Sequence, residues 1–152
     1  MIVYLVRHGA ALSAAENPGR PLSQDGRQGV ERIARSALDR EVQLAAIYHS
    51  GILRAKQTAE IFAKVLASSV AVQQHAGLLP DDDPAIVKAE LDCARQSILL
   101  VGHLPFLNHL AGLLIHGDPD RDVVEFLPAT MVRFHRVGGG WSIDWTLTQP
   151  RI

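Results

Sequence analysis

Residues 2–9 of the chain, Ile-Val-Tyr-Leu-Val-Arg-His-Gly, decide how the rest of the sequence is interpreted. The first five, residues 2–6, form an apolar run rich in β-branched side chains, which is typical of a strand buried on both faces. Arg7, His8 and Gly9 follow this run directly, so a permanent positive charge and an imidazole stand beside a residue without a side chain. We therefore expect a buried strand whose carboxyl end opens into a reactive loop.

Two further segments repeat this pattern of an apolar strand with polar residues at its end. Residues 44–48 predict a strand that runs into His49 and Ser50, and residues 97–101 predict a strand that leads to His103. In parallel α/β sheets, ligands bind beyond the carboxyl ends of the strands. The three segments should therefore bring their polar side chains to one edge of a sheet.

Helical stretches separate these strands, which indicates an α/β fold. The expected helices are one capped by Ser23 and reaching Leu38, one over 53–66, one from the turn at 81–84 to about Arg95, and one over 107–115. A short strand is expected at 70–72, and segments 131–137 and 141–147 flank three glycines and predict a terminal β-hairpin. We expect a mostly parallel central sheet ending in this hairpin, in a single domain over residues 1–152.

The charges of the 152-residue chain nearly cancel, with 15 Lys and Arg against 16 Asp and Glu. This balance excludes a chain-wide field that would draw the protein to nucleic acid or to an anionic membrane, so an anion site would have to be local. Cys93 is the single cysteine, which excludes an internal disulfide and a cluster of thiolate metal ligands. No apolar run has the length of a membrane span, and we expect a cytoplasmic protein.

His8 is the first candidate for chemistry. A neutral imidazole nitrogen is a nucleophile toward phosphorus, and the phosphoramidate that it forms is readily hydrolysed. Arg7 supplies positive charge beside it, and Gly9 allows the backbone to approach a ligand closely. The alternative is a structural or solvated histidine, which is the commoner role of a histidine taken alone.

Arg54 and His103 are the candidates on the other two segments. Arg54 lies near the start of the helix over 53–66, where the helix dipole favours an anion, and its guanidinium could clamp two phosphoryl oxygens. The alternative is an exposed helix on which Arg54 contacts Thr58 or Glu60. His103 could donate a hydrogen bond to a phosphoryl group as charge grows on it, or it could cap the helix that follows.

A metal site is not expected, although the chain has seven histidines. His103, His109 and His116 are separated by six and seven residues, and neither spacing places two ligands one helical turn apart. We therefore expect chemistry without a metal ion or any other cofactor.

Taken together, these motifs resemble those of the histidine phosphatase superfamily, also called phosphoglycerate mutase-like. The shared motifs follow in the family's order: Arg7-His8-Gly9, Pro21-Leu22-Ser23-Gln24-Asp25-Gly26, the pattern S-x-x-x-R-A-x-Q-T from Ser50 to Thr58, and Gly102-His103. Within the superfamily, the chain is most similar to the short bacterial SixA-type phosphohistidine phosphatases, because of its length, Arg20-Pro21-Leu22 and Gly102-His103-Leu104-Pro105-Phe106. The resemblance implies a three-layer sandwich with helices on both faces of the sheet.

The resemblance also implies a role for each matching position. His8 would be the nucleophile that accepts the phosphoryl group. Gly9 would belong to the phosphate-binding loop, and Arg20, on the loop before the first helix, would be a further ligand. The pocket around the phosphoryl group would be completed by Arg7, Arg54 and His103.

Two departures concern a phosphate ligand and the proton donor. Larger family members carry an asparagine soon after Arg-His-Gly, for which Asn17 is the nearest candidate here. They also place an acidic proton donor after the third strand, where this chain has Asp81, Asp82 and Asp83, with Asp81 the first choice. A phosphohistidine substrate would make a strong donor less necessary, since its leaving imidazole can take a proton from water.

The expected function is therefore a phosphatase that removes phosphoryl groups from a protein histidine through a covalent phosphohistidine on the enzyme. The chain between the third and fourth strands is short and mostly helical, so little of it could form a lid, and mutase chemistry is not expected. Two alternatives stay open: a phosphatase of small phosphoesters, and a phosphate-binding module without turnover. The expected partners are phosphorylated proteins or small phosphoesters, and neither nucleic acid nor membrane.

Overall fold

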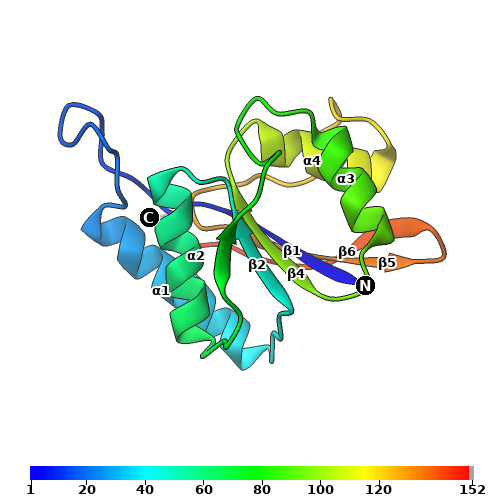
Figure 1. The fold of residues 1–152 in the computed structure, drawn as a ribbon, viewed down its shortest axis with the longest axis horizontal. Coiled ribbons are helices and arrows are strands. Elements are labelled where there is room, and N and C mark those ends of the chain that lie inside the picture. Colours follow the sequence, from blue (N-terminus) through cyan, green and yellow to red (C-terminus); the bar gives the residue numbers. More distant parts are fainter. Residues whose placement is uncertain (151–152) are drawn as a thin grey trace.

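In the computed structural model, which describes residues 1–150, one six-stranded sheet carries helices on both faces (Figure 1). The elements in chain order are β1 (Ile2–Arg7), α1 (Gln24–Asp39), β2 (Ala46–His49), α2 (Leu53–Val65), β3 (Val72–Gln74), α3 (Pro84–Cys93), β4 (Ile98–Gly102), α4 (Phe106–His116), β5 (Met131–Val137) and β6 (Gly140–Leu147). The predicted α/β class, the three layers and the C-terminal hairpin are confirmed. Within the described residues, no helix is both long and apolar enough to cross a membrane.

The strand order is β3-β2-β4-β1-β5-β6. The first four strands in this order run parallel, and β5 and β6 complete the sheet as an antiparallel hairpin that pairs with β1. In register, Arg7 pairs with Gly102 and His49 pairs with Val101. The chain therefore leaves β1, β4 and β2 at the same edge of the sheet and at nearly the same level.

The strand order explains why the helices divide between the two faces. The crossovers from β1 to β2 and from β2 to β3 move toward one side of the sheet, whereas the crossover from β3 to β4 moves back. Because such crossovers are right-handed, α1 and α2 fall on one face and α3 on the other, where α4 joins it (Figure 1). Successive strand residues alternate accordingly: Tyr4 and Val6 belong to the core under α1 and α2, and Val3 and Leu5 to the core under α3 and α4.

The third strand and the third helix are among the elements whose boundaries differ from the expected ones. The third strand, expected at 70–72, is β3 at Val72–Gln74, because a strand at the sheet edge pairs through its backbone and need not be apolar. The third helix ends at Cys93 rather than near Arg95. Its last carbonyls are bound by the guanidinium of Arg136 on β5, which lies 2.6 Å from the Leu91 oxygen and 2.9 Å from the Ala94 oxygen.

Two glycines form the turn of the terminal hairpin. Gly138 and Gly139 have φ values of 61° and 86°, and they lie between the paired residues Val137 and Gly140. Positive φ at both central residues is the requirement of a type I′ turn, which matches the twist of the two strands. The glycine run thus fixes the register of β5 against β6 at this end.

Candidate active site

The strand ends Arg7 and Gly102 pair with each other, so the residues that follow them, His8 and His103, lie side by side. Their ring centroids are 4.9 Å apart and the rings are tilted by 50°. The His8 amide also donates to the Gly102 carbonyl at 3.2 Å, which holds the two segments together beyond the last strand pair. The candidate site is thus built at the carboxyl edge of the sheet, between β1 and β4.

One ring nitrogen of His8 is already engaged. Nδ1 lies 2.8 Å from the Gly9 carbonyl oxygen, and because a carbonyl only accepts, Nδ1 carries the proton. Nε2 of the neutral ring then has a free lone pair. Burial is the main cause that lowers the pKa of His8 to about 4. The Gly9 hydrogen bond acts in the opposite direction, and the charges of Arg54, Arg7 and Arg20 add to the lowering. At neutral pH His8 therefore presents an unprotonated nitrogen, which is the nucleophilic form.

Two arginines provide the fixed charge of the site. Arg7 donates through Nη1 to the Phe126 carbonyl at 2.8 Å, which orients its guanidinium, and burial lowers its pKa. Burial and then the charge of Arg20 lower the pKa of Arg54. Both groups start so far above neutrality that they stay positive. In each, Nε is buried and has no hydrogen-bond partner in the described part of the chain.

His103 is only 2% exposed and makes one side-chain hydrogen bond. Its Nε2 lies 2.6 Å from the Ser50 hydroxyl oxygen, whereas its Nδ1 is buried without a partner in residues 1–150. Burial and, to a smaller extent, the neighbouring His8, Arg54 and Arg7 together lower the pKa of His103 to about 3. The ring is therefore neutral at physiological pH.

Three unsatisfied nitrogens meet at this site. Four buried side-chain atoms in residues 1–150 lack a hydrogen-bond partner, and three of them are Nε of Arg7, Nε of Arg54 and Nδ1 of His103. The fourth, Nδ1 of His135, lies 2.5 Å from a carboxylate oxygen of Asp144. Buried polar atoms are normally satisfied, so such a group indicates a site for a ligand rich in acceptors. A phosphoryl group has only acceptor oxygens and also matches the two positive charges.

Gly9 is needed for close packing and not for a special backbone conformation. A Cβ at this position would lie 2.6 Å from Cγ2 of Val30 on α1 and 3.0 Å from the Gly26 carbonyl oxygen. The Gly9 amide donates to the Thr58 hydroxyl at 3.1 Å, and this hydroxyl donates to the Arg54 carbonyl at 2.8 Å. The Gly9 amide is thus bound to Thr58, and the Gly9 carbonyl orients the His8 ring. Thr58 joins the predicted phosphate loop to α2.

Arg20 and Asn17 lie on the loop that precedes α1. Arg20 is exposed, has a φ of 47° and donates through Nε to the Leu12 carbonyl at 3.1 Å. Its charge is close enough to lower the pKa of both His8 and Arg54. The Asn17 side chain accepts a hydrogen bond from the Gly19 amide at 3.0 Å, so it shapes the loop. Within residues 1–150, none of the hydrogen bonds of Asn17 joins it to His8 or His103.

The three adjacent acids have different surroundings. Asp82 accepts from the Leu79 amide at 2.8 Å, and Asp83 caps α3 by accepting from the Ala85 amide at 3.0 Å. Asp81 is exposed and makes no hydrogen bond within residues 1–150. The structure therefore gives Asp82 and Asp83 structural tasks and leaves Asp81 available, although no hydrogen bond or ion pair within residues 1–150 joins Asp81 to His8.

Sequence reasoning did not anticipate the segment between α4 and β5, residues 117–130. This segment supplies the carbonyl that orients the Arg7 side chain, and it holds the Arg7 backbone. The Arg7 amide donates to the Thr130 carbonyl at 3.0 Å, and the Arg7 carbonyl accepts from the Ala129 amide at 3.1 Å. All of these partners are backbone atoms, so the residue types in this segment do not indicate the contacts with Arg7.

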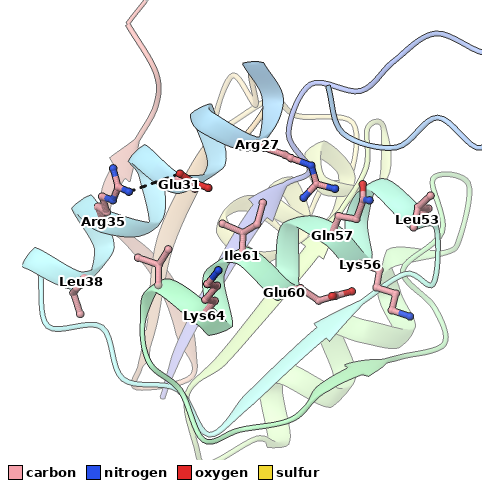
Figure 2. A pocket seen from close by; sticks show the side chains of 11 residues that line it. Arg27, Glu31, Arg35, Leu38, Leu53, Lys56, Gln57, Glu60, Ile61 and Lys64 are labelled. Atoms are coloured by element: carbon pink, nitrogen blue, oxygen red, sulfur yellow. Dashed lines mark ion pairs between the residues drawn. The ribbon is translucent and has the colours of Figure 1, made fainter. Parts of the chain in front are cut away.

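Two hollows lie near these elements. One of about 450 Å³ lies beside Arg7 and is lined by Leu104, Asn108 and residues 122–127. The other is a groove of about 810 Å³ between α1 and α2 (Figure 2). Its charged side chains are Arg27, Glu31, Arg35, Lys56, Glu60 and Lys64. Neither hollow is lined by His8 or His103.

A metal site would need several ligand side chains grouped close together. In residues 1–150, no three His, Cys, Asp or Glu side chains are grouped so that they could hold a metal ion. Chemistry without a metal stays a prediction, to be tested directly.

Known proteins share both the motifs and the fold. A family model described as histidine phosphatase superfamily (branch 1) matches residues 3–79. The chain is 31% identical over 123 residues to the phosphohistidine phosphatase SixA of Escherichia coli (strain K12), which covers 78% of this chain and 76% of the relative. It is similar to the structure of the protein histidine phosphatase SixA complexed with tungstate, with a TM-score of 0.84 and 26% identity over 97% of each chain. A phosphoglycerate mutase from Bacillus anthracis str. Sterne shares the fold at 15% identity, with a TM-score of 0.75 over 95% of this chain and 91% of that one.

Proposed function

Because the chain belongs to the histidine phosphatase superfamily, we propose that it is a phosphohistidine phosphatase, which removes phosphoryl groups from a histidine of a partner protein. The observation that carries this proposal is the group of buried, unpartnered nitrogens of Arg7, Arg54 and His103 around the neutral His8. The relatives support it: one is named a phosphohistidine phosphatase, and another was solved with tungstate, which is a tetrahedral oxyanion like phosphate.

In the proposed reaction, Nε2 of His8 attacks the phosphorus atom and forms a P–N bond to the enzyme. The P–N bond to the substrate histidine breaks, and the departing imidazole keeps the electron pair and takes a proton from water. Water then attacks the phosphorus, the bond to Nε2 breaks, and inorganic phosphate leaves. Arg7 and Arg54 would stabilise the equatorial oxygens, with the largest gain in the transition state.

Arg20 and Asp81 have smaller parts in the proposal. Arg20 would be a further phosphate ligand, since its charge already reaches His8 and Arg54 from an exposed loop. Asp81 would donate a proton to a leaving group that cannot easily obtain one from water. A departing imidazole can obtain one, so a phosphohistidine substrate suits a site in which the donor is exposed and loosely placed.

Comparing substrates tests this proposal. The purified protein would be assayed on a phosphohistidine protein and on a panel of aryl, alkyl, sugar and nucleotide phosphates. We expect the highest kcat/KM for the phosphohistidine protein. A higher kcat/KM for a small phosphoester would favour a small-molecule phosphatase, and failure to turn over any of these substrates would contradict an enzymatic function.

Replacing Asp81 sharpens this comparison. Asp81→Asn should cost less than about tenfold on the phosphohistidine protein and about a hundred- to ten-thousandfold on alkyl phosphates, which need a general acid. Asp83→Asn is the matched control, because Asn caps a helix as well as Asp does. An equal and severe loss on both substrate classes would show that Asp81 does something other than donate a proton.

We further propose that turnover needs no metal ion. The protein would be dialysed against a strong chelator and assayed without added metal, with full activity expected. A large loss that one divalent ion restores would contradict the metal-free reaction.

A further inference from the structure

We propose that Ser50 is a positioning residue that holds the ring proton of His103 on Nδ1, the nitrogen that would donate to the transferred phosphoryl group. This inference rests on the proposed function, because it assigns a task within that reaction. It starts from one contact: the Ser50 hydroxyl oxygen and Nε2 of His103 are 2.6 Å apart, and both residues are buried, at 5% and 2% exposed.

The direction of this hydrogen bond follows from the other contact of the hydroxyl. The Ile52 amide donates to the Ser50 oxygen at 3.3 Å, so the oxygen acts as an acceptor there. The hydroxyl proton still needs an acceptor, and within residues 1–150 the hydroxyl's one other hydrogen-bond contact is Nε2 of His103. If Ser50 donates to Nε2, that nitrogen carries no proton, and the proton of the neutral ring is on Nδ1.

The opposite assignment leaves more groups unsatisfied. If Nε2 carried the proton and donated to Ser50, the hydroxyl proton would have no acceptor among the described residues. Nδ1 of His103 would then present a lone pair, and it could not bond to a phosphoryl oxygen, which only accepts. Two buried polar groups would be unsatisfied in place of one, and each costs free energy.

The neutral ring of His103 holds a single proton, which can lie on either Nδ1 or Nε2. Burial keeps His103 neutral at physiological pH, with a pKa of about 3. A neutral histidine with no other contact could take either tautomer, and the donor to the phosphoryl group would then be present only part of the time. The hydrogen bond from Ser50 fixes the tautomer with the proton on Nδ1 before substrate binds.

The sheet itself places Ser50. His49, the last residue of β2, pairs with Val101, so Ser50, which follows it, stands beside Gly102, directly before His103. Ser50 also lies four residues before Arg54, so that one short segment orients His103 and supplies a guanidinium to the same site. The contact is therefore built into the strand register and does not depend on a flexible loop.

Nitrogen NMR of the histidine rings tests the inference without substrate. In protein labelled with ¹⁵N-histidine, the signals of His103 would be assigned by their loss in His103→Asn. We expect a pyrrole-like Nδ1 and a pyridine-like Nε2 in the wild type and in Ser50→Thr, which keeps the hydroxyl. In Ser50→Ala the two signals should shift toward the other tautomer, whereas Ser97→Ala, which removes a serine hydroxyl near the amino end of β4, should leave them unchanged.

Kinetics of the same variants connect the tautomer to turnover. We expect kcat on the phosphohistidine protein to fall about 10- to 100-fold in Ser50→Ala, with KM changed far less, by analogy with other residues that orient a functional histidine. Ser50→Thr should recover most of kcat. A protonated Nε2 in the wild type would overturn the inference even if Ser50→Ala did not fold, as would a folded Ser50→Ala with unchanged signals. If the tautomer behaves as expected but no substrate is turned over, the proposed function fails while the assignment of Ser50 stands.

Discussion

One hydrogen bond to a backbone carbonyl decides which nitrogen of His8 can react. Nδ1 donates to the Gly9 oxygen at 2.8 Å, so the phosphoryl group should be found on Nε2 of His8 during turnover. The two phosphohistidine isomers differ in their NMR spectra, and an alkaline quench followed by peptide mapping would locate the label. His8→Ala should abolish turnover, whereas His109→Ala on α4 should not. Phosphate on Nδ1, or on another residue, would contradict the geometry.

Arg54 offers a second prediction for a single side chain. Its buried Nε has no partner in residues 1–150, so the guanidinium is placed to bind an oxyanion through the N–H donors along its planar edge. Arg54→Ala should lower kcat about a hundredfold or more, as the loss of one transition-state donor does. Arg54→Lys should recover only part of this, because an ammonium is a point charge and cannot make both bonds. Arg35→Ala, on the exposed face of α1, is the control, and full activity of Arg54→Lys would argue against bidentate binding.

Single residues could be selected from the sequence only where they carry their own chemistry. His8, Arg54 and His103 were expected at one sheet edge because each follows or begins an element there, and the structure brings them together; their roles stay predictions. The contact of Ser50 with His103 spans 53 residues, and that of Arg7 with Phe126 spans 119. Such contacts depend on strand register and on backbone atoms, neither of which is visible in residue types.

At the scale of elements, the first turn of α1 determines where the loop after His8 can lie. A Cβ on Gly26 would lie 1.9 Å from the Ala10 carbonyl oxygen, whereas a Cβ on Gly29 would meet the side chain of Gln149 at 2.5 Å. Backbone cannot move aside cheaply, but the end of a glutamine can. The two glycines therefore form a matched pair on one helix.

Gly26→Ala should destabilise the protein by about 1–3 kcal/mol or more, as overpacking does, and should lower kcat because Ala10 lies two residues from His8. Gly29→Ala should be nearly neutral, since the better helix propensity of Ala offsets the displacement of Gln149 by up to about 1 kcal/mol. Denaturant unfolding and a turnover assay on both variants would measure this difference. Equal stability of the two variants would contradict the packing argument.

Elements with strong periodicity were predictable, and those held by backbone contacts were not. The apolar stripe and the Ser23 cap located α1, where the Ser23 hydroxyl accepts from the Gly26 amide at 2.9 Å. The edge strand β3 was misplaced by two residues, since Gln73 and Gln74 pair with β2 without an apolar pattern. The segment over 117–130 has little regular structure, so the sequence there has no periodic apolar pattern from which its contacts with Arg7 could be predicted.

At the scale of the whole molecule, the reversal of strand order after β3 returns the chain to the centre of the sheet. β4 is thereby inserted between β2 and β1, and the two histidines that follow β1 and β4 become neighbours whose rings burial keeps uncharged. The same burial that gives His8 a free lone pair makes protonation costly for the fold. Catalysis and acid stability should therefore be linked.

The sign of this link can be worked out from the two pKa values. Unfolded, each histidine has a pKa near 6.5, whereas in the folded chain burial lowers the pKa of His8 to about 4 and of His103 to about 3. Between pH 6.5 and about 4 the unfolded chain binds more protons than the folded one, so the free energy of unfolding should fall as the pH falls. Each group can contribute at most about 1.4 kcal/mol per pH unit.

Denaturant unfolding at a series of pH values from 7 to 4.5 would measure this loss. The slope of unfolding free energy against pH should be shallower in His8→Asn than in the wild type, because one buried base has been removed. His116→Asn, at the last turn of α4, should follow the wild-type slope. The kcat/KM of the wild type should stay level through pH 6.5 and decline only as the pH approaches about 4, where His8 itself gains a proton. Parallel slopes for His8→Asn and the wild type, or a kcat/KM that halves near pH 6.5, would mean that His8 is not held neutral by burial.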